Sequence, residues 1–212
     1  MTHKNFIIDI QGKYACFTRP ELSVEKYSYS VITPAAAKNI LNSVYYKDQM
    51  RWVIDKIHIY NKPSFLNYKY NGILEKNNCK KGIDDFNYLI SNENRVQLNA
   101  TILKDVHYVI EAHIEMNKKY EINEQNNPIK HEQMALRRLE KGQFARCPFL
   151  GCREYTAEIE LLDNVPLNEI EDFEIGPMAW GFNYFTKETI MFIPKMKNGT
   201  IIIPDLDPEG GN

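Results

Sequence analysis

Two adjacent side chains with the chemistry of a phosphodiester site, Lys130 and His131, stand at the start of a predicted helix. Asn127 can cap this helix and Pro128 suits its first turn. Backbone N–H groups and the positive end of the helix dipole therefore gather beside the pair, which favours a phosphate group. A histidine, whose ordinary pKa is about 6.5, can transfer a proton there near neutral pH.

The same helix carries further basic side chains at helical spacing. Lys130, Arg137 and Lys141 fall on one stripe, and His131 and Arg138 fall on an adjoining stripe. A basic face headed by a histidine is compatible with phosphodiester chemistry. A charged helix face is, however, more often simply solvated, and the helix alone favours that simpler interpretation.

The chain gives little sign of metal chemistry. No cluster of acidic residues with metal-binding spacing accompanies the Lys-His pair, so two-metal hydrolysis has little support and we expect no metal and no cofactor. RNA supplies its own nucleophile, the 2′-hydroxyl, and needs only a base, an acid and stabilisation of charge on the phosphate. The cysteines have neither CxxC spacing nor a paired histidine, so neither a zinc site nor a disulfide framework is indicated; they are Cys16, Cys79, Cys147 and Cys152.

The formal net charge of −2 over 212 residues hides an uneven distribution. Residues 1–60 carry a net charge of +3, residues 61–129 are balanced, and residues 130–153 carry +4. Residues 154–212 carry −9. A basic segment can hold phosphates while an acidic surface faces elsewhere. An uneven solvated surface with no such role is the competing interpretation.

Composition predicts an ordinary folded protein outside membranes. Apolar residues make up 43% of the chain, enough for a hydrophobic core, and no stretch approaches the length of a membrane span. The N-terminal apolar run is short and lacks the layout of a signal peptide. Free thiols without an export signal indicate a cytoplasmic location and no membrane partner.

Local patterns predict an α+β fold. Over residues 1–163 we expect the order strand, helix, strand, strand, helix, strand, which matches the ferredoxin-like arrangement of many RNA-binding modules. Strand-like runs are expected at 6–17, 51–60, 95–103, 106–116 and 154–162, one more than this order contains, and the helices at 33–46, capped by Thr33, and 128–142.

Three connecting regions complete this prediction. Lys104 and Asp105 suit a hairpin turn between the third and fourth strands, and the polar residues 61–94 suggest an insertion or mobile loop. Residues 164–212 are expected to form a separate small antiparallel β-sheet domain. Its strands are expected at 178–185, 189–194 and 200–203, with Asn198-Gly199 as the turn between the last two.

Six segments in the first 155 residues occur together in one order: FTRPELSVEKYSYSVITPAAAKNIL (17–41), VYYK (44–47), RWVIDKIHIYNKPSF (51–65), LKDVHYVIEAHIE (103–115), KHEQMALRRLEKGQ (130–143) and PFLGCREY (148–155). As a set they resemble the CRISPR-associated Cas-five proteins of subtype I-C, which process precursor CRISPR RNA. Residues 178–185 and 198–204 match that family more loosely.

The resemblance implies a function and a catalytic set. In that family a metal-independent endoribonuclease cleaves the base of the repeat hairpin and stays bound to the product as a subunit of a type I-C interference complex. The family's catalytic tyrosine and Lys-His pair correspond to Tyr45, Lys130 and His131. His131 would transfer protons, Lys130 would stabilise the charged phosphorane, and Tyr45 would orient the 2′-hydroxyl or assist the transfer. Ile129 stands where the family often has glycine.

The basic residues of this region become candidate RNA phosphate contacts under the same resemblance: Arg137, Arg138, Lys141, Arg146 and Arg153. Arg153 could equally pair with a carboxylate of the fold. Two other classes of function compete with the nuclease. A non-catalytic scaffold that grips CRISPR RNA is the main alternative, and a small-molecule enzyme gains no support because no cofactor motif is present.

Overall fold

A long central strand, β5 (Arg95–Met116), organises the computed structural model, which describes residues 5–22, 24–73, 95–123, 126–183 and 185–206. The second half of β5 pairs antiparallel with β1 (Phe6–Ala15) on one side and with β3 (Met50–Ile59) on the other. Strand β6 (Glu158–Leu162) pairs with the free side of β1. The central strands therefore lie in the order β6, β1, β5, β3.

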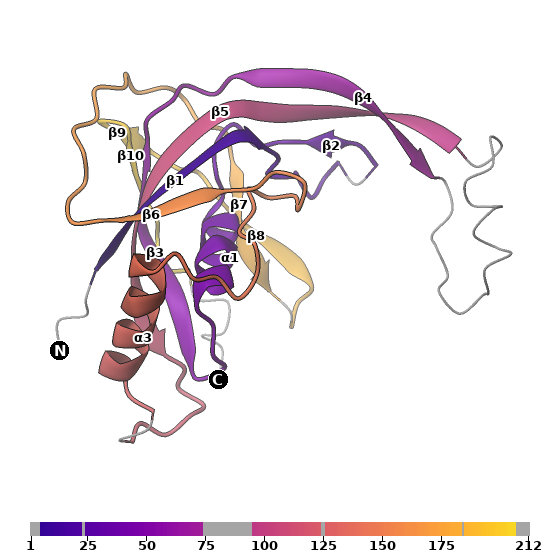
Figure 1. Ribbon diagram of the computed structural model, residues 1–212. Helices are drawn as coiled ribbons and strands as arrows, with labels where there is room; N and C mark the ends of the chain where they lie inside the picture. The colour runs from indigo at the N-terminus through magenta and orange to yellow at the C-terminus, as the bar shows by residue number, and fades with distance from the viewer. Residues whose placement is uncertain (1–4, 23, 74–94, 124–125, 184, 207–212) are drawn as a thin grey trace, which may run out of the picture.

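Two helices cover one face of this sheet. Helix α1 (Pro34–Val44) packs on β3, helix α3 (Pro128–Glu140) packs on β5 and β6, and the two helices contact each other (Figure 1). The side chains of α1 that face the sheet are fully buried. The expected α+β class, with a mostly antiparallel sheet and two helices, is confirmed.

Each helix begins where a side chain caps it. Thr33 Oγ1 accepts a hydrogen bond from the N–H of Ala36 at 3.2 Å, and a proline follows at the first helical position. Asn127 Oδ1 accepts from the N–H of Lys130 at 2.9 Å, again followed by proline. Both predicted helix starts are confirmed, because caps depend only on residues within one turn.

The predicted hairpin at Lys104-Asp105 is wrong, because β5 continues through it as one strand of 22 residues. Asp105 does have a positive φ of 52°, as a turn residue would. Strand β1 nevertheless pairs with β5 on both sides of it, from Gly12 opposite Val106 to Ala15 opposite Leu103. Pairing with β1 on both sides of Asp105 keeps β5 a single strand, and the left-handed residue lies near the point where its other neighbour changes from β3 to β4.

That other neighbour is β4 (Phe65–Ile73), which lies within the stretch expected to be an irregular loop. The expectation is wrong for residues 65–73, which pair antiparallel with the first half of β5. The two strands project from the body of the protein beyond the helices (Figure 1), so their side chains are largely exposed and the apolar pattern is weak. Residues 74–94 lie outside the described part of the chain.

The C-terminal region contains a two-stranded antiparallel sheet, β7 (Met178–Asn183) with β8 (Glu188–Phe192). The expected third strand is β10 (Thr200–Ile202), which joins the main sheet by pairing with β3 instead of with β8. A short strand, β9 (Met196–Lys197), pairs with β10 across the predicted turn. Ile201 of β10 is fully buried. The hairpin formed by β9 and β10 thus extends the main sheet at the edge of β3.

Two further features complete the fold. Strand β2 (Lys26–Tyr27) pairs with the projecting half of β5. No helix in the described ranges combines the length and apolar character needed to cross a membrane. The division of the chain at residues 163 and 164 into two domains stays a prediction.

The segment after α3 returns to the sheet through a close backbone approach at Gly151. Its φ is +83°, and a Cβ added there would overlap the carbonyl oxygen of Cys16. The N–H of Cys16 also donates to the carbonyl of Leu150 at 3.0 Å. Only glycine fits this position, because both the backbone conformation and the contact exclude a side chain.

Gly151→Ala should therefore lower the free energy of unfolding by roughly 3 kcal/mol, from overlap added to conformational strain. Gly142→Ala is the matched control: Gly142 also has a positive φ, of 58°, but nothing lies within 4 Å of an added Cβ. That control should cost only about 1 kcal/mol. Urea unfolding of both variants measures the difference, and equal losses would contradict the close approach.

Candidate active site

Tyr45 terminates helix α1 and turns its side chain toward the other helix. It is the C-cap residue, in extended conformation, and its side chain is only 3% exposed. Its carbonyl oxygen accepts a hydrogen bond from the indole N–H of Trp52 at 2.9 Å. Trp52 is itself buried in the core against Phe6. Tyr45 is thus attached to the hydrophobic core through its backbone.

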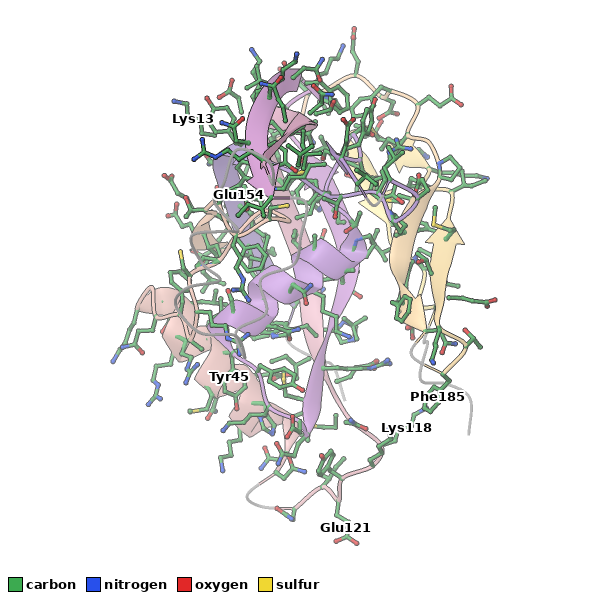
Figure 2. All side chains as sticks on the ribbon, turned by 90° about the vertical axis from the view of Figure 1, so that its right-hand side faces the viewer. Lys13, Tyr45, Lys118, Glu121, Glu154 and Phe185 are labelled. Atoms are coloured by element: carbon green, nitrogen blue, oxygen red, sulfur yellow. The ribbon has the colours of Figure 1, made fainter. Side chains whose placement is uncertain are left out.

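Tyr46, the second tyrosine of the pair, points elsewhere. Its side chain is 57% exposed, and its hydroxyl donates to the carboxylate of Asp48 at 3.0 Å. The sequence offered two adjacent tyrosines at the end of the helix. The structure brings only Tyr45 to the predicted Lys-His pair (Figure 2 labels Tyr45).

His131 lies in the first turn of α3 on its buried side, in line with Ala135 and Leu139. The Tyr45 hydroxyl lies 2.8 Å from Nδ1 of His131, although the two residues are 86 positions apart in the chain. The other ring nitrogen, Nε2, lies 3.1 Å from Oδ1 of Asn126. The residue is only 5% exposed, and both nitrogens of its ring have hydrogen-bonding partners.

Burial lowers the pKa of His131 below its ordinary value of 6.5, and the positive charges of Lys130 and Lys47 lower it further. Each of these causes opposes the charged imidazolium. Burial also raises the pKa of the Tyr45 hydroxyl, against a smaller opposing effect of Arg138. At neutral pH the pair consists of a neutral phenol and a neutral imidazole, so the imidazole is free to accept a proton.

Lys130 lies beside this pair on the exposed side of the helix. Lys47, just after the end of α1, is exposed as well. Ile129, which directly precedes Lys130 and His131, is 61% exposed, so its side chain does not pack into the core. Two lysines and the N-terminus of a helix surround a neutral proton acceptor, and together they attract a phosphate group.

Arg138 has a structural contact that the sequence did not reveal. Its guanidinium donates to the carbonyl oxygen of Val44, the last residue of α1, at 2.8 Å. The same group lies over the Tyr45 ring, 5.4 Å from its centre. Arg138 therefore links α3 to the end of α1 by a hydrogen bond and packs on the ring of Tyr45. A direct contact with RNA stays a prediction for this residue.

The other basic residues divide into two groups by position. Arg137, Lys141 and Arg146 are exposed on α3 or just after it. The N–H of Arg146 contacts the carbonyl of Ser43 in the last turn of α1, at 3.4 Å, so this arginine belongs to the same end of the protein as Tyr45. Arg153 is exposed next to Glu154, which lies far from Tyr45 (Figure 2). The structure does not bring Arg153 to the cluster.

The remaining described histidines lie in β3 and β5 and bind carboxylates. His58 lies 2.8 Å from Glu111, His107 lies 2.6 Å from Asp9, and His113 lies 2.8 Å from Asp55. These three histidines therefore form hydrogen bonds within the sheet. Within the residues that the structure describes, no group of three or more His, Cys, Asp or Glu side chains is placed to hold a metal ion.

Sequence reasoning missed Asn126 and Lys47 as neighbours of the site. Asn126 precedes the cap residue and carries no motif of its own, and Lys47 is one exposed lysine among many. Their proximity to His131 depends on how the ends of α1 and α3 meet. The sequence showed the adjacency of Lys130 and His131 directly, and Tyr45 only through the resemblance.

The sequence of this chain matches that of a class of CRISPR-associated proteins. Residues 6–199 match the family model Cas_Cas5d, described as CRISPR-associated protein (Cas_Cas5). The chain therefore belongs to the Cas5d family of CRISPR-associated proteins.

Known relatives agree with this assignment. A protein of Mannheimia succiniciproducens, named CRISPR pre-crRNA endoribonuclease Cas5d, is 38% identical over 93% of this chain and 93% of its own. A protein of Thermus thermophilus with the same name is 29% identical over 82% of this chain and 71% of its own.

Two crystal structures have a similar fold. One, of a CRISPR-associated protein, has a TM-score of 0.72 and covers 95% of this chain and 92% of the other, with 24% identity. The other, of a functionally uncharacterized protein from Streptococcus mutans, has a TM-score of 0.70, with the same identity, and covers 95% of this chain and 93% of its own. At this level of identity the similarity concerns the fold.

The electrostatics of the site give a prediction for His131. Lys130→Ala removes one of the two positive charges that lower its pKa, so the pKa should rise toward the ordinary 6.5. Titration of the imidazole signals by NMR in the free protein measures this directly. Lys141→Ala, at the far end of the same helix, is the control and should leave the pKa unchanged. A pKa that stays constant or falls in Lys130→Ala would contradict the arrangement.

Proposed function

We propose that this chain is a metal-independent endoribonuclease that cleaves precursor CRISPR RNA at the repeat hairpin. The observation that carries the proposal is the 2.8 Å hydrogen bond between the Tyr45 hydroxyl and Nδ1 of His131, at a helix N-terminus beside Lys130. The names of two relatives, both called CRISPR pre-crRNA endoribonuclease Cas5d, support the substrate class.

The chemistry requires one proton acceptor and one source of positive charge. The 2′-hydroxyl of RNA attacks the adjacent phosphorus, so that a 2′-O–P bond forms and the P–5′-O bond breaks. The proton of the 2′-hydroxyl passes to the Tyr45 oxygen while the Tyr45 proton passes to Nδ1 of His131. The imidazolium then returns a proton, by the same path, to the departing 5′-oxygen. The products are a 2′,3′-cyclic phosphate and a 5′-hydroxyl.

Lys130 supplies the charge. It stands in the first turn of α3, where the helix N-terminus already favours an anion. During attack, negative charge grows on the oxygens of the phosphorane, and an ammonium group beside them stabilises that charge. Tyr45, Lys130 and His131 thus form the proposed catalytic set, with neither a metal nor a cofactor.

The RNA would follow the exposed basic surface of α3. Arg137, Lys141 and Arg146 are its candidate phosphate contacts, because all three are exposed near the helix. Arg138 would act through Tyr45. Arg153 would contact a more distant part of the RNA.

The wider assignments of fold and partners rest on the same family. The strand order β6, β1, β5, β3, with α1 and α3 as the two crossovers, supports a ferredoxin-like domain. We propose residues 1–163 as that domain and residues 164–212 as a small second one, which adds β10 to the edge of the main sheet at β3. The product RNA would stay bound while the protein joins the other subunits of a type I-C interference complex in the cytoplasm.

A non-catalytic RNA scaffold is the second candidate, and one observation favours it. Tyr45 and His131 are only 3% and 5% exposed, so RNA must gain access to a nearly covered pair. A scaffold would need no such access. The two candidates differ in whether repeat RNA is cut.

Cleavage of repeat RNA should persist in a metal chelator and stop when the 2′-hydroxyl at the cut site is replaced by hydrogen. His131→Ala should slow single-turnover cleavage by about two to four orders of magnitude, with little change in RNA affinity. Tyr45→Phe should also slow cleavage, because it removes the hydroxyl that relays the proton. The variant keeps the aromatic ring, so packing is preserved. Time courses at saturating protein measure these rates.

Tyr46→Phe is the matched control for Tyr45→Phe, since it deletes the neighbouring, exposed hydroxyl. It should cut at the wild-type rate. A product with a 3′-hydroxyl that forms only with magnesium would contradict the mechanism. Tight binding of repeat RNA without any cleavage by the wild type would favour the scaffold.

Adjacent arginines should have separable effects. Arg137→Gln should weaken RNA binding and lower the dependence of log affinity on log salt by about one unit per lost phosphate contact. Arg138→Gln should instead lower the free energy of unfolding by about 2 kcal/mol, because it loses the contacts with Val44 and Tyr45. Salt titrations and urea unfolding compare the two. Identical behaviour would contradict the division of roles.

A further inference from the structure

Asn126 directly precedes Asn127, the cap residue of α3, and its side chain reaches the ring of His131. Its Oδ1 lies 3.1 Å from Nε2 of His131, and its Nδ2 donates to the carbonyl oxygen of Glu121 at 2.7 Å. A backbone carbonyl can only accept, so the amide nitrogen must face Glu121. The orientation of the amide is therefore determined, and its oxygen must face the imidazole.

The backbone around Asn126 holds this side chain in place. Asn123 and Asn126 exchange backbone hydrogen bonds of 3.0 and 3.1 Å, and the N–H of Asn126 also reaches Oδ1 of Asn123 at 2.9 Å. The next residue, Asn127, caps α3. Asn127 thus caps the helix, and Asn126 contacts the ring of His131.

An amide oxygen in this position determines which ring nitrogen carries the proton. Oδ1 accepts only, so Nε2 of His131 must be the protonated nitrogen in the neutral ring. Nδ1 then presents its lone pair to the Tyr45 hydroxyl, which lies 2.8 Å away and donates to it. The opposite tautomer would place a lone pair of Nε2 against the lone pairs of Oδ1.

We propose that Asn126 is a positioning residue for RNA cleavage, which holds His131 in the tautomer whose Nδ1 can take the proton relayed by Tyr45. The inference rests on the proposed function of Tyr45 and His131. When Nδ1 gains the proton, Nε2 keeps its own and its bond to Asn126, so the ring stays in one orientation throughout the reaction. Asn126 contacts Nε2 and not the nitrogen that takes the proton.

The tautomer can be observed without any cleavage. Nitrogen NMR of the imidazole at pH 8, where His131 is neutral, should show a protonated Nε2 and an unprotonated Nδ1 in the wild type. Asn126→Leu, which removes the acceptor at similar size, should yield a mixture of the two tautomers. Asn127→Ala, which removes the helix cap, is the control: it should lower Tm while leaving the nitrogen pattern unchanged.

Asn126→Asp keeps an acceptor facing Nε2 but loses the hydrogen bond that the amide donates to the carbonyl oxygen of Glu121. Among the described residues, the charged and titratable groups around His131 are Tyr45 and Lys47 at the end of α1, Lys130 on α3, and Arg138 over the Tyr45 ring. The new carboxylate adds a single negative charge to them. It should preserve the Nε2–H tautomer, raise the pKa of His131, and move the acid limb of kcat/KM to higher pH.

The kinetic test separates positioning from general destabilisation. Asn126→Leu should slow single-turnover cleavage of repeat RNA by about ten- to a hundred-fold, with unchanged RNA affinity. Asn126→Asp should restore most of the rate at pH 8. In a His131→Ala background, Asn126→Leu should cause no further loss, because its effect passes through the ring.

The outcomes distinguish this inference from the function on which it rests. A wild type that binds but never cuts repeat RNA would overturn the proposed function, and the nitrogen spectrum would still decide the tautomer. If the wild type cuts and Asn126→Leu cuts equally fast, the inference is wrong and the proposed function stands. A wild-type ring protonated on Nδ1 would also overturn it, even if Asn126→Leu failed to fold.

Discussion

The hydrogen bond between Tyr45 and His131 joins the end of one crossover helix to the start of the other. Both groups are buried, and a buried polar group that loses its partner costs about 1 to 3 kcal/mol. The two helix ends are therefore held in one relative position. Three basic residues lie around this bond because they belong to the same helices or directly follow them: Lys130, Lys47 and Arg138.

The sheet makes this meeting of helices possible. Helix α1 connects β1 to β3, and α3 connects β5 to β6, and both cross the same face. Strand β5 sets the frame, since its second half separates β1 from β3 and so fixes the spacing of the helices that return to them. Trp52 of β3 holds the carbonyl of Tyr45, so the sheet also anchors the catalytic candidate directly.

The positive charges around the pair have a double effect. After burial, which is the larger cause, they further lower the pKa of His131 and so favour a neutral ring that can accept a proton, and in the proposed function they would also attract the RNA phosphate. The acidic residues of the central strands are kept apart, on β1, β3 and β5, where they bind His58, His107 and His113. A chain with a net charge of −2 can in this way present a basic site.

The sequence by itself determined the helix starts and the adjacency of Lys130 and His131, because caps and neighbouring side chains act within one turn of the chain. It also pointed to Tyr45 through family resemblance. Only the tertiary structure decided that Tyr45 and not Tyr46 faces the histidine, that Arg138 supports the site, and that β5 continues through Asp105. These outcomes depend on burial and pairing between segments far apart in the chain, which no local pattern encodes.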